Sequence, residues 1–302
     1  MITHNLVGGL GNQLFQIFTT IALAIQTKQP FFFIYHEMTD GITPRNTYWN
    51  SFLNKLKPYT RNDLPLIHPL IKPKMEIIKE ISFNYSPINI INYTDDDDLL
   101  TFYLLDGYFQ SYKYFENNFL QICNKIGVRT MQTELLPFFQ DITKQYKTTI
   151  SMHFRLGDYK LFPLCHPIIP YEYYRNSLKF ILQKEEEFEN ICVLYFCEDE
   201  DIEIVENNYL KQLMVEFPTC VFKNTAVTLG IQEDWKNLLL MSLCTHNIIA
   251  NSSFSVWGAY FNQNTLKKVC YPEIWFGDGI PNAKDVSDIF HPEWYKISCY
   301  NI

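Results

Sequence analysis

The N-terminal stretch of the chain alternates between strand and helix patterns. Ile2–Val7 predicts a buried strand, and the glycine-rich run Gly8–Asn12 that follows it breaks the chain. Apolar side chains then recur at helical spacing until Pro30, after which Phe31–Tyr35 predicts a second strand. A strand, a glycine turn, a helix and a strand in this order form a βαβ unit. This unit predicts an α/β fold with parallel strands.

A second series of the same kind begins near residue 148. Thr149–Phe154 predicts a strand, Tyr171–Gln183 a helix, and Ile191–Phe196 a parallel strand buried on both faces. Two such series predict two Rossmann-like, doubly wound domains, residues 1–140 and 141–302, with the C-terminal tail packing back on the first domain. Because such domains bind ligands at the carboxyl ends of their strands, we expect the two to face a cleft.

Composition and charge exclude several classes of partner. The formal net charge of −8 argues against broad binding to nucleic acid or to an anionic membrane. No apolar stretch approaches the ~20 residues of a membrane-spanning helix, and no basic and apolar leader opens the sequence. The eight cysteines are scattered without a CxxC pair, which favours free thiols over disulfides or zinc. We therefore expect a soluble, cytoplasmic protein whose oligomeric state the sequence does not indicate.

The first candidate motif is the run GGLGNQ at residues 8–13, which contains Gly11 and Asn12. Glycines after a strand allow a tight turn and a close approach of ligand to backbone. The N-terminus of the helix that follows favours an anion. A purely structural turn explains the same residues equally well.

The second motif is His153–Tyr159, at the end of the strand Thr149–Phe154. Side chains alternate across a strand, so His153 and Arg155 project to one side. Only five of the 25 basic residues are arginines, and the planar fork of an arginine matches two phosphate oxygens. The structural alternative is an Arg155–Asp158 ion pair that fixes a loop. Both hold if Asp158 orients Arg155 for a diphosphate.

The third motif opens a helix after an apolar strand. Its first residues are Asn251, Ser252, Ser253, Phe254 and Ser255. Serine and asparagine cap helices there, and free N–H groups with hydroxyls form a cradle for phosphate. An ordinary helix cap is the alternative interpretation.

An acidic loop, Glu198–Asp201, follows the strand Ile191–Phe196. A carboxylate at a strand end, for which we select Asp199, can accept from both the ring N–H and the amino group of guanine. Asp199 and Asp201 also form a DxD string, which in some transferases binds a divalent metal at a sugar diphosphate. A solvated loop is the structural alternative.

Together these strings resemble glycosyltransferase family 11, the α-1,2-fucosyltransferases. Residues 8–16 match a GGLGNQ(L/M)FQ opening, residues 107–111 a GYFQS segment, residues 153–159 HxRRGDY, and residues 244–259 a long C-terminal motif. The resemblance covers nearly the whole chain. This chain has Leu156 where the family has a second arginine, and Val256 where it has the first tryptophan of SWWGA.

The resemblance implies a GT-B fold and an inverting transfer of L-fucose from GDP-fucose to an acceptor oligosaccharide, the 2-hydroxyl of a galactose-like residue, without a metal or other cofactor. The nucleotide would lie mainly on the C-terminal domain. Arg155 would hold the diphosphate, with His153 near the nucleotide and Ser252–Ser255 lining the phosphate site. Asn12 would reach the donor from the N-terminal domain. The motifs do not identify a general base.

Two other functions fit parts of the same sequence. A metal-dependent transferase would use Asp199 and Asp201 with another nucleotide sugar, and it would lose activity with EDTA. A catalytically inactive protein would bind a sugar nucleotide or a glycan without releasing GDP.

Overall fold

A computed structural model describes residues 1–39, 44–63, 74–90, 101–183, 190–280 and 285–301. The chain divides into two compact units. Unit 1 comprises Met1–Arg129 with Asp285–His291, and unit 2 comprises Thr130–Lys284 with Pro292–Ile302. The division falls near the start of helix α3, about ten residues before the expected boundary. A segment close to the C-terminus groups with unit 1.

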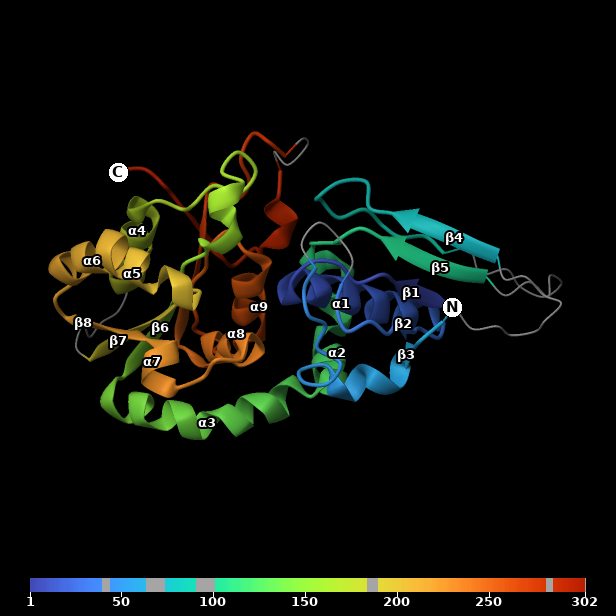
Figure 1. Cartoon of the computed structure of the whole chain (residues 1–302), viewed down its shortest axis with the longest axis horizontal. Coiled ribbons are helices and arrows are strands. Elements are labelled where there is room, and N and C mark those ends of the chain that lie inside the picture. The colour runs from blue at the N-terminus through green and yellow to red at the C-terminus, as the bar shows by residue number, and fades with distance from the viewer. Residues whose placement is uncertain (40–43, 64–73, 91–100, 184–189, 281–284, 302) are drawn as a thin grey trace. The chain divides into compact units, whose positions relative to one another are not determined.

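Unit 1 contains the βαβ unit expected from the sequence (Figure 1). Its strands and helices are β1 (Ile2–His4), α1 (Leu10–Thr27), β2 (Phe33–Ile34), β3 (Thr60–Arg61), β4 (Lys74–Lys79), β5 (Thr101–Asp106) and α2 (Phe119–Ile126). The strand pairs are parallel, in the orders β1-β5-β4 and β2-β3, and a parallel bridge joins Ile2 to Phe31. The apolar face of α1, with Phe15 and Phe18, is fully buried. This burial fixes the turn before α1 against β1.

Unit 2 is built on a six-stranded parallel sheet. Its elements are α3 (Val128–Gln145), β6 (Thr148–His153), α4 (Tyr171–Leu182), β7 (Ile191–Phe196), α5 (Ile202–Val205), α6 (Lys211–Glu216), β8 (Cys220–Asn224), α7 (Thr225–Leu229), α8 (Asp234–Leu243), β9 (His246–Ile248), α9 (Ser253–Phe261), β10 (Val269–Pro272) and β11 (Tyr295–Ile297). A π-helical turn, Glu206–Leu210, joins α5 to α6. Residues 202–216 therefore form a continuous helical segment with one wider turn inside it.

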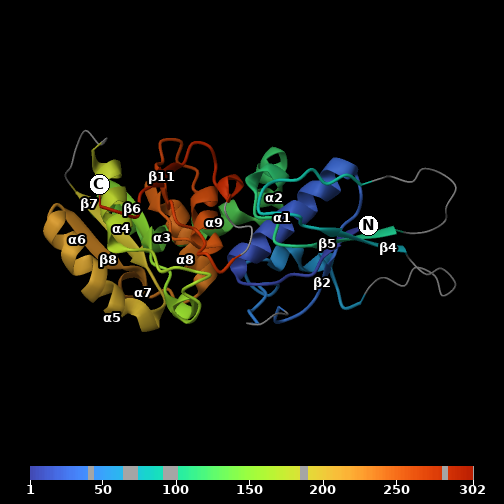
Figure 2. The same ribbon diagram turned by 90° about the horizontal axis from the view of Figure 1, so that it is seen from above.

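Helices cover both faces of this sheet. In Figure 1, α4, α5 and α6 lie on one side and α3, α7 and α8 on the other. Helices α8 and α9 lie side by side in that view and in the view from above (Figure 2). Ile150, Met152 and Phe154 of the β6 segment point into a buried apolar cluster with α4. The alternate residues, including His153, therefore face the opposite way.

The fold class is confirmed as α/β, with two units built on parallel strands. The strand order in unit 2 is β8-β7-β6-β9-β10-β11. Read in chain order from β6, this is 3-2-1-4-5-6, the doubly wound arrangement of Rossmann folds. The predicted cleft between the domains stays a prediction. No described helix is long and apolar enough to cross a membrane.

Candidate functional site

The strand order of unit 2 brings two of the predicted motifs to one place. The order reverses between β6 and β9, and α/β sheets bind ligands outside the carboxyl ends of the strands at such a switch point. His153 ends β6, and the turn Asn251–Ser252 follows β9. The rings of His153 and Phe254 lie 5.7 Å apart between centroids, and the Tyr159 hydroxyl donates to the Asn251 carbonyl at 3.1 Å. The second and third motifs thus lie in contact with each other.

Arg155 is held from two directions at this site. Its guanidinium donates to Asp158, from its own loop, and to Glu198, from the loop after β7. It also lies over the ring of Tyr159, 4.8 Å from the ring centre. Burial lowers the pKa of Arg155, but the charges of Asp158 and Glu198 outweigh that effect and raise the pKa. The guanidinium is a fixed, permanently charged fork, and the expected Arg155–Asp158 pair is present.

His153 is neutral in this structure at any physiological pH. Burial, reinforced by the positive charge of Arg155, lowers the pKa of His153 to about 3. The Nδ1 atom of the ring is buried and has no hydrogen-bond partner among the described residues. An imidazole in this state offers one neutral hydrogen-bonding atom.

In the acidic loop, Asp201 is buried and Asp199 is exposed. Asp201 is fully buried, accepts from the Gly157 amide at 2.7 Å, and forms an ion pair with Lys160. Asp199, the predicted guanine carboxylate, is exposed. Among the described residues, no three His, Cys, Asp or Glu side chains cluster as a metal site requires. Asp201 therefore serves to hold the loop of the second motif in place.

The turn Asn251–Ser255 caps helix α9, and the hydroxyls of its serines hydrogen-bond to its own backbone. The Ser252 side chain accepts from the Phe254 amide at 3.4 Å, as an N-cap does. The Ser255 hydroxyl is buried and donates to the Ser252 carbonyl at 3.2 Å. The Asn251 amide donates to the carbonyls of Pro167 and Trp275. These three side chains thus shape the turn, and its helix N-terminus is the group that favours an anion.

The first motif lies in unit 1 at the start of α1. Gly11 is buried inside the helix, and Asn12 is partly buried and accepts from the Gln110 side chain at 2.8 Å. Gln13 donates to the Gly8 carbonyl at 2.9 Å, and Gln16 accepts from the Val7 amide at 3.0 Å. The glutamines of the motif therefore hold the glycine turn, and Asn12 meets the GYFQS segment.

Sequence reasoning overlooked Glu198 and Asp201 as partners of the second motif. Both follow a buried parallel strand that pairs with β6, so their place beside the end of β6 could have been expected from parallel register. The amide network of Asn247 was overlooked as well. Asn247 donates to the Ser151 hydroxyl at 2.7 Å and accepts from Asn262 at 2.8 Å. Part of the long C-terminal motif, residues 244–259, therefore holds β9 against its neighbours.

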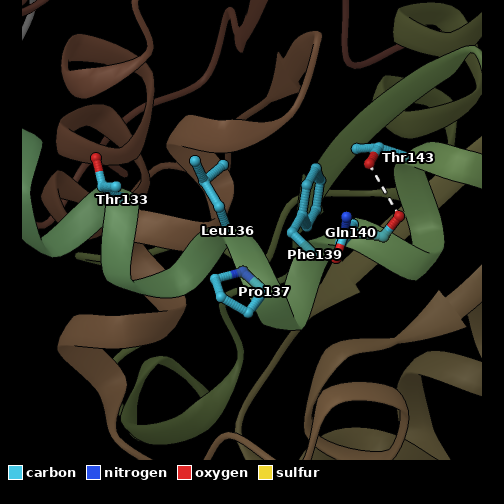
Figure 3. Close-up of a pocket in the computed structure, with 6 residues that line it drawn as sticks. All are labelled: Thr133, Leu136, Pro137, Phe139, Gln140 and Thr143. Carbon is cyan, nitrogen blue, oxygen red and sulfur yellow. Dashed lines mark hydrogen bonds between the residues drawn. The ribbon is translucent and has the colours of Figure 1, made fainter.

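A shallow hollow on helix α3 is separate from all three motifs. Its lining residues all come from that helix: Thr133, Leu136, Pro137, Phe139, Gln140 and Thr143 (Figure 3). A hollow lined by one helix offers few convergent polar groups. The motif residues at the end of β6 are the stronger candidates for a site.

The comparisons with known proteins decide the family. The model of the family described as Glycosyl transferase family 11 matches residues 1–298. The chain belongs to glycosyl transferase family 11. The O-antigen biosynthesis glycosyltransferase WbnK of Escherichia coli is 26% identical over 304 residues, covering 90% of this chain and 93% of that protein. An α-1,2-colitosyltransferase of Escherichia coli is 28% identical over 180 residues, covering 56% of this chain and 55% of that protein.

Two solved structures are distantly similar to this family 11 chain. A mutant of Arabidopsis thaliana FUT1 in complex with GDP has a TM-score of 0.45 at 11% identity, covering 89% of this chain and 70% of that one. The NodZ α-1,6-fucosyltransferase co-crystallised with GDP has a TM-score of 0.43 at 10% identity, covering 85% and 91%. Membership of family 11 rests on the sequence match.

Proposed function

We propose that this family 11 glycosyltransferase transfers L-fucose from GDP-fucose to an acceptor glycan, with inversion and without a bound metal. The acceptor group we propose is the 2-hydroxyl of a galactose-like residue. The observation that carries the proposal is the doubly held Arg155 at the switch point of unit 2. Arg155 lies over Tyr159, which bonds to the turn before α9. The similarity to an α-1,2-colitosyltransferase supports the proposed α-1,2 linkage.

The proposed chemistry places the growing negative charge next to the Arg155 guanidinium and the N-terminus of α9. The acceptor oxygen forms a bond to the anomeric carbon of fucose and releases its proton to solvent. The bond from that carbon to the diphosphate breaks at the same time, and GDP departs with the bonding electrons. Negative charge grows on the diphosphate in the transition state. Arg155 and the N–H groups at the start of α9 stabilise it without reorganisation, because both are already fixed.

The neighbouring side chains keep this charge pattern in place. Asp158 orients the guanidinium, and neutral His153 adds no second cation that would compete for the same partners. His153 lies near the proposed nucleotide site, since its ring is close to that of Phe254 at the start of α9. Asp199 remains our proposed guanine contact, since it is exposed at the end of β7.

A thermal-shift panel with GDP-, UDP- and dTDP-sugars, each with and without EDTA, tests the proposal. We expect stabilisation by GDP and GDP-fucose alone, unchanged by EDTA, and release of GDP when a galactose-terminated acceptor is added. Preference for a UDP-sugar would overturn the donor. Loss of activity with EDTA would favour the metal-dependent alternative, and binding without GDP release would favour the inactive one.

The second candidate concerns the sugar rather than the nucleotide. The name of one relative indicates transfer of colitose, so GDP-linked colitose belongs in the turnover assay beside GDP-fucose. Mass spectrometry of the product distinguishes the two transfers by the mass added to the acceptor.

A further inference from the structure

Glu80 holds a carboxylate against the backbone of the GYFQS segment. It follows β4 directly, and its amide donates to the Asp106 carbonyl at 2.8 Å, which continues the pairing of β4 with β5. Its Oε2 accepts from the Tyr108 amide at 2.7 Å. The Glu80 carboxylate is therefore bonded to the backbone of the turn Gly107–Gln110.

The backbone of the turn Gly107–Gln110 adopts conformations that are costly for most residues. Phe109 has a φ of +53°, in the left-handed region where a bulky side chain is costly. Gly107 has a φ of +154°, and a Cβ there would lie 2.3 Å from the Cβ of Glu80. Phe109 is nevertheless fully buried, edge-on to His4 with ring centres 5.8 Å apart. The hydrogen bond that Glu80 accepts from the Tyr108 amide helps to offset the conformational cost of this turn.

The turn delivers Gln110 to Asn12. The buried Gln110 side chain donates from Nε2 to the Asn12 Oδ1 atom at 2.8 Å. A carboxamide whose oxygen accepts a bond from one side presents its NH₂ group in a defined direction. The Gln16 side chain donates to the Gly107 carbonyl at 3.4 Å, so α1 and the turn are tied at a second point.

The charge on Glu80 is costly for the fold and is poorly placed for proton transfer. Burial raises the pKa of Glu80, and the nearby backbone amides of Tyr108, Phe109 and Gln110 only partly oppose this. One of its carboxylate oxygens already accepts from the Tyr108 amide. A carboxylate kept at a cost in stability fits a role in function.

We propose that Glu80 is a positioning residue that sets the direction of the Asn12 amide through the turn Gly107–Gln110. This inference rests on the proposed function and on the expectation, implied by the family resemblance, that Asn12 contacts the donor. The turn thereby links two hydrogen bonds: Glu80 accepts from its Tyr108 amide, and its Gln110 side chain donates to Asn12.

A double-mutant cycle tests the coupling. We compare Glu80→Gln, Asn12→Ala and the double variant by KM for GDP-fucose, with kcat and melting temperature alongside. We expect Glu80→Gln to raise the donor KM roughly tenfold, since misplacing a positioning group by about an ångström is costly. In the Asn12→Ala background the same change should add no further loss. Fully additive effects, or an unchanged KM, would overturn the proposal.

A matched control and a second measurement separate this inference from the function it builds on. Glu76→Gln removes a carboxylate from the same strand, where it forms only a partly exposed ion pair with Lys74. It should leave both KM and kcat at wild-type values. Hydrogen exchange at residues 107–111 should accelerate in Glu80→Gln alone, and unchanged exchange would overturn the inference even if no GDP-sugar is turned over. A wild type that uses no GDP-sugar would instead overturn the proposed function.

Discussion

Arg155 and Glu198 meet although 43 residues separate them in the chain. Arg155 follows β6 and Glu198 follows β7, and the parallel pairing of these strands places His153 beside Phe196. Glu198 is about half exposed, while the Arg155 side chain is largely buried. The arginine that we propose for a diphosphate thus already has a carboxylate partner that solvent can reach.

Replacing Arg155 tests the site most directly. Arg155→Ala should lower kcat with GDP-fucose by ~10²–10³, the loss expected when one preorganised donor is removed. Arg155→Lys should recover part of the rate, because an ammonium keeps the charge but not the fork. Arg175→Ala is the control, since Arg175 bonds only to Asn176 and Asn301 among the described contacts. Near-normal turnover by a folded Arg155→Ala variant would refute the role.

Removing the charge of Glu198 should tighten nucleotide binding. In Glu198→Gln the guanidinium loses a competing anion, and an exposed ion pair is worth up to about 1 kcal/mol, or roughly fivefold in Kd. Isothermal titration with GDP measures this change. Asp158→Asn is the comparison and should weaken binding, because Asp158 orients Arg155 from its own loop. Weaker binding by Glu198→Gln would show that Glu198 orients Arg155 as well.

Gly157 should tolerate no side chain. Its φ is +35°, and a Cβ would lie 2.6 Å from both carboxylate oxygens of Glu198. Gly157→Ala should lower the free energy of unfolding by about 1–2 kcal/mol, the usual cost of a left-handed residue. Gly9→Ala serves as the control because a Cβ there meets nothing within 4 Å, and it should change stability by under about 0.5 kcal/mol. Equal effects in chemical denaturation would contradict this prediction.

Stability should fall as the pH is lowered below 6.5. The pKa of His153 is about 3 in the folded chain, against 6.5 as its ordinary value, because burial disfavours the charged ring. Between these pH values the unfolded chain binds a proton that the folded chain does not. His153 therefore contributes a slope of up to about 1.4 kcal/mol per pH unit, with stability rising as pH rises.

The variant His153→Gln isolates this slope. Between pH 4 and pH 6 it should reduce the slope of the unfolding free energy against pH by up to about 1.4 kcal/mol per pH unit, which corresponds to one proton. His4, whose pKa burial lowers to about 4, adds a slope of the same sign and stays in place as an internal reference. An unchanged slope in His153→Gln would mean that His153 becomes protonated in the folded chain.

The fold was largely predictable because periodicity and register are local signals. Ile191–Phe196 reads as a buried parallel strand and is one, and the predicted strand Thr149–Phe154 pairs with it. The strands of unit 1 were less visible, since β2 and β3 have two residues each and gain their stability from tertiary pairing. Leu156, which stands where the family has a second arginine, is buried in the apolar cluster.

The details of the site were harder to predict, because they depend on which partner each polar group meets. A serine that caps a helix and one that binds phosphate have the same sequence signature, and Ser252 and Ser255 proved to bond to their own turn. Likewise, nothing in the string Glu198–Asp201 shows that Asp201 is the buried residue and Asp199 the exposed one. Such distinctions arise from the contacts between distant segments.

Because of the segment Asp285–His291, a single cut in the chain does not separate the two units. It groups with unit 1, yet the residues on either side of it group with unit 2. Asp285 accepts from the Asn84 side chain, and Asp288 accepts from the Tyr85 amide and pairs with Lys113. A fragment that ends near residue 129 would leave Lys113 and the Tyr85 amide without these partners. Expression of the N-terminal half alone therefore calls for a supplied peptide spanning residues 285–291.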